Sequence, residues 1–190
     1  LAKKEDFRVL TKFQIYVTLP AAIIQTFHGF KVNFSMFIVP VLALLFFFLN
    51  CGIAIISSKN NSREGCAFLI LNATAYNNGG FTMAFVQNIL PASGVAAVAL
   101  FDIGNMATAT AFNYIIASIV LNKKNQKFNL KYVFYQLIHS FPFVLYFVLT
   151  LMSLLSITIP EFLMVPANMI APANIVIVMI AIGVGMEINI

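Results

Sequence analysis

The chain has 190 residues, of which 61% are hydrophobic and only 9% are charged. Soluble domains are about 45–50% apolar and about 25% charged, so this composition excludes an ordinary soluble protein and predicts an all-α integral membrane protein. The net charge is +5, but the basic residues stand in short gaps between apolar blocks, which indicates membrane topology rather than nucleic-acid binding.

Apolar blocks of spanning length follow one another along the chain. A bilayer core needs about 20 helical residues. The predicted membrane helices are residues 9–30, 34–57, 66–90, 94–121, 132–156 and 168–190. The sequence therefore predicts a polytopic helical bundle in which residues 1–190 form a single membrane domain.

Lysine and arginine are distributed unevenly over the gaps between these blocks. Lys31 is the only basic residue in residues 31–33, 91–93 and 157–167. The other gaps and the chain start hold the rest: Lys3, Lys4, Arg8, Lys12, Lys59, Arg63, Lys123, Lys124, Lys127 and Lys131. Under the positive-inside rule this alternation predicts six crossings with a cytoplasmic chain start. We also expect the chain to be a piece of a longer protein, with a membrane helix ahead of Lys3.

The third block, residues 66–90, contains the run Asn77-Asn78-Gly79-Gly80. Adjacent glycines disfavour a helix by about 1 kcal/mol each, and Asn and Gly tolerate left-handed backbone angles, so the helix should break here. A half-helix starting after Gly80 would direct its positive N-terminus at the break and favour an anion. The alternative is that the glycines only permit close helix packing and that the asparagines cap a kink.

Asp102 is a carboxylate within the fourth block. At about 1.5 Å per residue, it and Asn78 both lie near the midplane of a bilayer core about 30 Å thick. Asp102, Asn105, Ala109 and Asn113 recur at spacings of three and four, which predicts a stripe that faces protein or water. Asp102 could bind a coupling proton or sodium ion, or it could be a hydrogen-bonded structural carboxylate.

Other polar and special residues have simpler interpretations. Asn50, Gln14 and Gln25 are expected to form hydrogen bonds between helices, and His139 to be a packing histidine. Cys51 and Cys66 are expected to be small buried hydrophobes. Kinks are expected at the prolines within the blocks, Pro20, Pro40, Pro142 and Pro172. The sequence has no nucleotide loop, no Ser/His/Asp arrangement and no metal-ligand spacing, so it predicts neither an enzyme nor a bound cofactor.

Several of these motifs resemble one family. Asn77-Asn78-Gly79-Gly80-Phe81, Gly94 and Leu100–Asn105, with Thr18-Leu19-Pro20 and Ile182–Met186, are similar to segments of bacterial-type permeases of the auxin efflux carrier family. The resemblance implies a ten-helix fold of two inverted five-helix repeats, of which this chain would be helices two to seven. Residues 34–121 would belong to the moving domain, and residues 9–30 and 132–190 to the scaffold, which also makes a homodimer contact. Where the family often has a proline at the crossing of its broken helices, this chain has Phe85.

The resemblance also implies a function and a location. The protein would be a secondary transporter of a small organic anion, such as malate, malonate or an auxin-like acid, in a bacterial plasma membrane. The substrate would be held by Asn77, Asn78, Gly79, Gly80 and Phe81, with Asp102, Asn105 and Asn50 as supporting or ion-coupling residues. The alternatives are a sodium-coupled symporter of the bile-acid type and a membrane sensor or structural subunit that transports nothing.

Overall fold

The computed structural model describes residues 4–87, 89–121 and 130–186, and within them all regular structure is helical. The predicted all-α class is therefore confirmed. The chain divides into two compact units. Unit 1 comprises Leu1–Asn33, Asn77–Ala99 and Leu145–Ile190, and unit 2 comprises Phe34–Tyr76 and Leu100–Val144.

Unit 1 is built around its first long apolar helix, which consists of α1 (Lys4–Phe13), the π-helical turn η1 (Gln14–Thr18) and α2 (Leu19–Phe27). The π turn is closed by a hydrogen bond from the Leu19 N–H to the Gln14 carbonyl. Only Leu19 separates it from Pro20, which has no N–H to continue the α-helical pattern.

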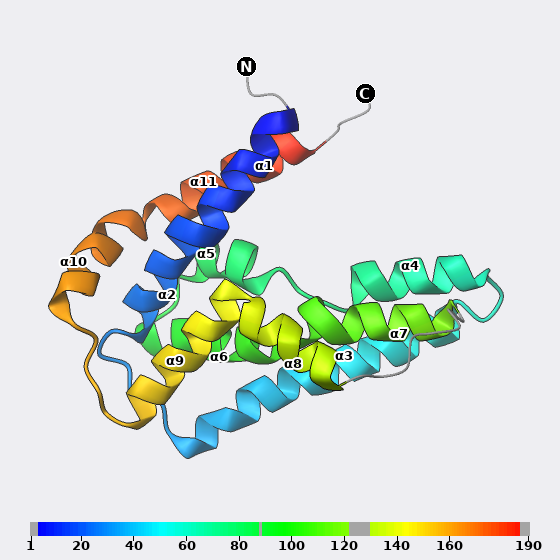
Figure 1. The fold of residues 1–190 in the computed structure, drawn as a ribbon, viewed down its shortest axis with the longest axis horizontal. Helices are drawn as coiled ribbons and strands as arrows, with labels where there is room; N and C mark the ends of the chain where they lie inside the picture. Colours follow the sequence, from blue (N-terminus) through cyan, green and yellow to red (C-terminus); the bar gives the residue numbers. More distant parts are fainter. Residues whose placement is uncertain (1–3, 88, 122–129, 187–190) are drawn as a thin grey trace. The chain divides into compact units, whose positions relative to one another are not determined.

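The end of the chain packs against this first helix. As Figure 1 shows, α11 (Ala173–Gly185) runs alongside α1, and α10 (Glu161–Ile170) lies against α2. The contact between α2 and α10 is a seam of buried alanines that lets the backbones approach closely: Ala21, Ala22, Ala167 and Ala171. α10 and α11 are bent by 43° at a short break that contains Pro172, which confirms the kink predicted there.

Three further segments belong to unit 1. They are the short helix made of η3 (Asn78–Thr82) and α5 (Met83–Val86), the start of α6 (Ala92–Ala107), and most of α9 (Phe141–Leu154). The η3 and α5 segments both contact α11.

Unit 2 contains η2 (Phe34–Phe37), α3 (Ile38–Ser57), α4 (Arg63–Ala73), the rest of α6, η4 (Thr108–Phe112), α7 (Asn113–Val120) and α8 (Leu130–His139). α4 packs on both α3 and α7 (Figure 1). The core between them includes Phe47, Ile70 and both cysteines, Cys51 and Cys66, which are buried and free, as predicted. Pro40 lies in the first turn of α3, where its missing N–H removes no hydrogen bond from this helix, and Phe34–Ser57 is one uninterrupted helix.

The turn between α3 and α4 ends in a capped helix start. The Ser62 hydroxyl accepts a hydrogen bond from the Gly65 N–H at 3.2 Å. Hydrogen bonds from the main-chain N–H of Glu64 and from Ser62 hold the pKa of the Glu64 carboxyl below its usual range. This polar turn suits a segment outside the membrane.

Three described helices are long and apolar enough to cross a membrane, and five are if each bent pair counts as one crossing. The continuous helices are Asp6–Phe27, Phe34–Ser57 and Ala92–Val120, close to three predicted blocks. The fifth block, residues 132–156, is a bent pair with its break at Ser140, next to Pro142. The last block was predicted to begin at Asn168, but helix begins at Glu161, because Pro160 and Glu161 form a helix start.

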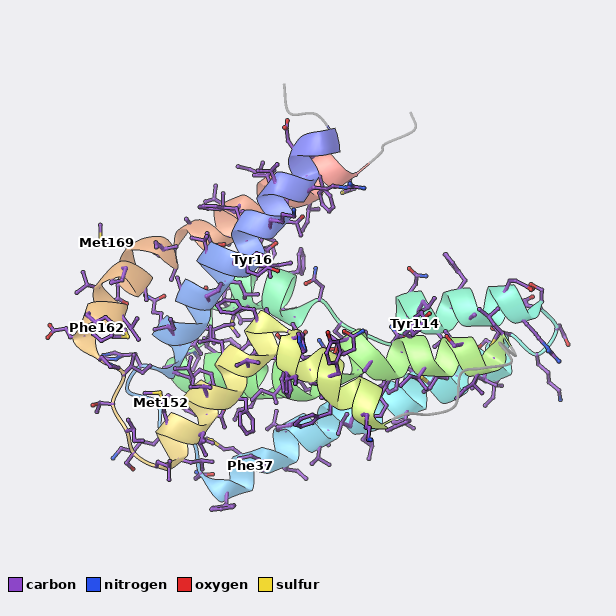
Figure 2. All side chains as sticks on the ribbon, in the orientation of Figure 1. Tyr16, Phe37, Tyr114, Met152, Phe162 and Met169 are labelled. Atoms are coloured by element: carbon purple, nitrogen blue, oxygen red, sulfur yellow. The ribbon has the colours of Figure 1, made fainter. Side chains whose placement is uncertain are left out.

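Apolar side chains cover much of the outer surface, as expected in lipid. Figure 2 shows Phe162 and Met169 projecting from α10, where they are 74% and 78% exposed. Tyr16 and Tyr114 are exposed in the same way on their own helices. In a soluble protein, this much exposed apolar surface would cause association.

Candidate functional site

The third predicted block is interrupted, which confirms the prediction that it is not one helix. α4 ends at Ala73 and helix resumes at Asn78. The interruption comes earlier than predicted, at residues 74–77, and Gly79 and Gly80 lie in the π turn that follows it. The break does not use the left-handed backbone angles that Asn and Gly tolerate, since the positive-φ residues among those described are Gly29 and Ser156.

The side chains of Thr74 and Asn113 close the end of α4. The Thr74 hydroxyl donates to the Ile70 carbonyl at 2.6 Å and lies 3.0 Å from Asn113 Oδ1. Asn113 Nδ2 donates to the Leu71 carbonyl at 3.2 Å. Thr74 is fully buried and Asn113 nearly so. Two of the last carbonyls of α4, which have no intrahelical N–H donor, are thereby bound, Ile70 by the residue that ends the helix and Leu71 by a neighbouring helix.

Asn105 binds both main-chain groups of Tyr76. The Tyr76 N–H donates to Asn105 Oδ1 at 2.9 Å, and Asn105 Nδ2 donates to the Tyr76 carbonyl at 2.6 Å. A side-chain amide thus acts as a neighbouring peptide group would in a β-sheet. Because Asn105 is only 2% exposed, the main-chain N–H and carbonyl of Tyr76 are satisfied without water.

The two other predicted support residues belong to the same cluster. Asn105 Nδ2 also donates to Asp102 Oδ1 at 3.0 Å, and the Asp102 side chain is fully buried. Asn50, on α3, donates from Nδ2 to the Tyr76 hydroxyl at 2.6 Å. The Tyr76 ring also lies beside Phe101, with 6.0 Å between centroids. Asp102, Asn105 and Asn50 are therefore brought together around Tyr76.

Sequence reasoning assigned no role to Tyr76 or Thr74, because the importance of both residues depends on partners far along the chain. The predicted stripe on α6 and α7 is confirmed for Asp102, Asn105 and Asn113, which are buried. Ala109 is exposed instead. The helix is a π turn at that point, so spacings of three and four residues no longer mark one face across it.

The predicted substrate residues Asn77–Phe81 lie in unit 1, whereas Asp102, Asn105 and Asn50 lie in unit 2. The Asn77 side chain is exposed and its carbonyl accepts from the N–H groups of Phe81, at 2.9 Å, and Thr82, at 3.3 Å. Asn78 is half-buried, and its Oδ1 accepts from the Thr82 hydroxyl at 3.3 Å. That Asn78 and Asp102 share one layer of the membrane stays a prediction.

The remaining members of this group have distinct environments. Gly79 is buried, and Gly80 follows it in the same π turn. Phe81 is 42% exposed, with its ring centroid 4.8 Å from that of Phe85. The first N–H groups of any helix lack an intrahelical acceptor, and here they belong to Asn78, Gly79 and Gly80. These donors make the start of the η3–α5 helix suited to an anion.

Polar contacts within unit 1 also join helices. Gln25 Nε2 donates to Asn168 Oδ1 on α10 at 3.3 Å, as predicted for a residue that links helices. Thr18 donates to Asn174 Oδ1 on α11 at 2.9 Å, and both side chains are fully buried. Sequence reasoning missed this second pair. His139 bonds through Nδ1 to the Tyr135 carbonyl of its own helix at 2.8 Å.

Within the described ranges, no group of three or more His, Cys, Asp or Glu side chains could hold a metal ion. Comparison of the chain with protein-family models, with curated proteins and with solved structures gives no match. The site is therefore interpreted from its own geometry.

Proposed function

We propose that this chain belongs to a secondary membrane transporter that carries a small organic anion, such as a malate-like, malonate-like or auxin-like acid. The observation that carries the proposal is the interrupted helix at residues 74–77. Non-helical backbone at membrane depth survives only where protein or a water-filled cavity surrounds it, and transporters use such interruptions as binding sites.

The hydrogen bonds around the interruption support this interpretation. A helix broken by chance would leave main-chain groups unpaired, at about 1–3 kcal/mol each. Here Asn105 and Asn113 bind the groups that the break exposes, at Tyr76 and Leu71. Residues of the helix formed by α6, η4 and α7 thus supply hydrogen bonds that the break requires.

The chemistry at the start of the η3–α5 helix favours a carboxylate. The N–H groups of Asn78, Gly79 and Gly80 and the side-chain amides of Asn77 and Asn78 are hydrogen-bond donors. The run of residues 66–121 contains no lysine or arginine, so an anion would be held by these donors and the helix dipole. Asp102, through Asn105, would fix the position of Tyr76, which directly precedes Asn77 in the chain. Asp102 would also be the site for a coupling proton or sodium ion.

A flux assay on the full chain in proteoliposomes tests the proposal. Asn78→Ala should reduce uptake of radiolabelled organic acid by at least about tenfold, since it removes a donor from the site. Asn72→Ala is the matched control, because Asn72 is exposed and, among the residues that the structure describes, its side chain bonds only to the Phe68 carbonyl of its own helix, at 2.8 Å. Undiminished flux in a folded Asn78→Ala protein would refute the site, and strict sodium dependence would favour the symporter alternative. An absence of flux for every acid in the unchanged protein would favour the sensor or structural subunit.

A further inference from the structure

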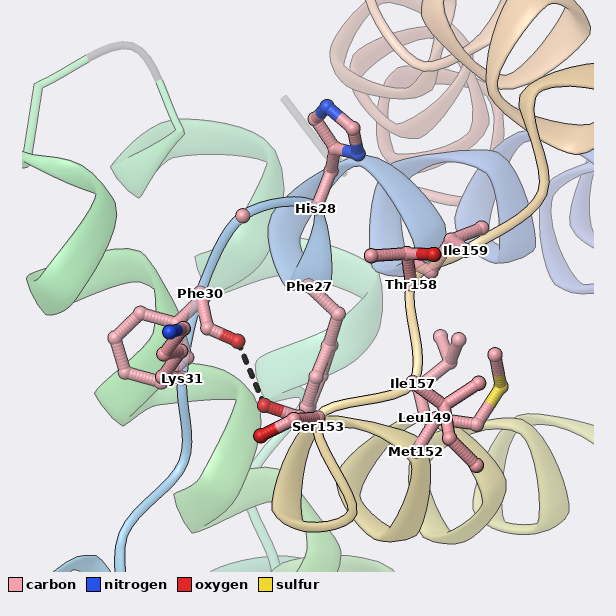
Figure 3. Close-up of a pocket in the computed structure, with 12 residues that line it drawn as sticks. Phe27, His28, Phe30, Lys31, Leu149, Met152, Ser153, Ile157, Thr158 and Ile159 are labelled. Atoms are coloured by element: carbon pink, nitrogen blue, oxygen red, sulfur yellow. Dashed lines mark hydrogen bonds between the residues drawn. The ribbon is translucent and has the colours of Figure 1, made fainter.

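Unit 1 contains a cavity of ≈ 290 Å³ that the predicted site residues do not line. It lies where α2 and α9 end, and its walls come from residues 27–31 and from residues between 149 and 159 (Figure 3). Both helices belong to segments that are long and apolar enough to cross a membrane, α9 as part of a bent pair. The cavity therefore belongs at the boundary between membrane and water.

The walls of the cavity are fixed by hydrogen bonds. The Ser153 hydroxyl donates to the Phe30 carbonyl at 2.6 Å and accepts from the Val32 N–H at 2.9 Å, so it ties the loop after α2 to α9 (Figure 3). Gly29, with φ +70, provides the left-handed residue that this loop requires. On the other side, α9 ends in a Schellman turn around Ser156, with Ile157 N–H bonded to the Met152 carbonyl at 2.8 Å. A cavity held at both walls is formed before a ligand arrives.

Its lining is apolar inside and basic at the rim. Phe27 and Leu149 are 4% and 5% exposed and form the interior with Met152, and Ile157, which is 52% exposed, extends this apolar lining outward. Lys31 is exposed at the rim, and within the described residues its ammonium group forms no hydrogen bond or ion pair. The other basic side chain, His28, points away from Ser153 in Figure 3.

Lys31 is also an exception to the charge pattern. It is the only lysine or arginine between Lys12 and Lys59, and it lies in a gap that the positive-inside rule leaves without positive charge. A topology signal does not require a lysine at this place. A cation above an apolar cavity at the membrane surface does match an acidic lipid, whose head needs a counter-charge and whose chains need an apolar surface.

We propose that this cavity binds an anionic phospholipid, with the phosphate group at Lys31 and the first part of an acyl chain against Phe27, Leu149 and Ile157. Free phosphate shares the head-group chemistry but not the chain, so the two sources of phosphate can be separated. The site is independent of the proposed transport, and binding is measured without flux.

The test is a titration of the full chain in neutral detergent micelles with short-chain phosphatidylglycerol, phosphatidylcholine or inorganic phosphate. Binding is measured as a shift in the midpoint temperature of thermal unfolding. Phosphatidylglycerol should raise the midpoint of the unchanged protein. In Lys31→Gln its binding should weaken about fivefold, because one basic residue near an anionic surface contributes about that factor. Lys31→Arg keeps the charge and should bind normally.

Lys59→Gln is the matched control, since Lys59 is an exposed lysine of the α3–α4 turn and lines no part of this cavity. Ile157→Ser, which keeps Lys31 but makes part of the apolar lining polar, should also weaken the lipid effect. The proposal is overturned if Lys31→Gln responds like Lys59→Gln. It is equally overturned if phosphatidylcholine, or inorganic phosphate alone, raises the midpoint as much as phosphatidylglycerol does.

Discussion

Tyr76 is held at both ends by asparagines that lie far from it in the sequence. Asn105 binds its N–H and carbonyl, and Asn50 binds its hydroxyl. Its side chain is nevertheless 41% exposed. This residue is therefore important for its main chain. Tyr76 lies between the end of α4 and the start of η3, so its N–H and carbonyl have no partners within a helix.

Replacing Asn105 should consequently be costly. Asn105→Leu leaves the Tyr76 main-chain groups and Asp102 without this partner, and we expect the free energy of unfolding to fall by about 2–3 kcal/mol. The measurement is a denaturant titration of the full chain in detergent micelles. Asn72→Leu, an exposed asparagine on α4, should change it by only about 0.5 kcal/mol. Equal effects of the two substitutions would contradict the role given to Asn105.

Ser156 allows a prediction of the opposite sign. It has φ 55 at the end of α9, where a side chain is disfavoured and glycine is not. Ser156→Gly should therefore stabilise the protein by about 0.5–1 kcal/mol in the same titration. Ser57→Gly, which places glycine in the last turn of α3, should destabilise it by a similar amount. A loss of stability in Ser156→Gly would show that the left-handed turn is not formed.

At the level of the elements, α3 and α6 are in unusually close contact at Gly104. A Cβ added to Gly104 would collide with the Pro40 carbonyl oxygen and lie 2.9 Å from the Ala43 Cβ. Backbone cannot give way as a flexible side chain can. This contact positions the helix that carries Asp102 and Asn105 against α3, which carries Asn50.

Gly104→Ala should therefore lower the free energy of unfolding by about 1–3 kcal/mol through overpacking. Gly52→Ala on α3 is the control, because a Cβ added there meets nothing within 4 Å. That substitution should stabilise the helix by up to about 1 kcal/mol. If both variants were equally stable, the two helices could not be as close as the structure has them.

For the whole molecule, the sequence predicted the long apolar helices well, because hydropathy and length determine them. The second and fourth blocks agree with Phe34–Ser57 and Ala92–Val120 to within about two residues. The sequence predicted the start of the last helix too late, at residue 168 instead of Glu161. Pro160 is a recognisable signal for a helix start, but residues 157–167 were interpreted as a gap between apolar blocks. That the chain crosses the membrane six times, and that it is part of a ten-helix fold of two inverted repeats, stay predictions.

The candidate site could be predicted in its residue types but not in its pairing. Asp102, Asn105 and Asn50 stand out because polar groups in apolar blocks need partners. Which groups Asn50 and Asn105 bind depends on contacts over 26 or more residues, since both bind Tyr76, one at its hydroxyl and the other at its main chain. The place of the break shifted toward α4 for the same reason. Glycine marks where a helix is weak, whereas Asn105 and Asn113 determine where its ends are bound.

The π turn η4 has a consequence that is best expressed as rotational phase. An α-helix turns about 100° per residue, so Asn105 and Asn113, eight residues apart, would differ by about 80° in a regular helix. One extra residue in the turn reduces this difference to about 20°, and both side chains then reach the same helix end. A chain shorter by one residue between Thr108 and Phe112 could wind as a regular α-helix with Asn105 and Asn113 seven residues apart, and these two would still differ by only about 20°. Winding the present residues as a regular α-helix, without a deletion, would instead rotate Asn113 by about 100° away from Thr74, so the site depends on the π winding of this turn as well as on its residues.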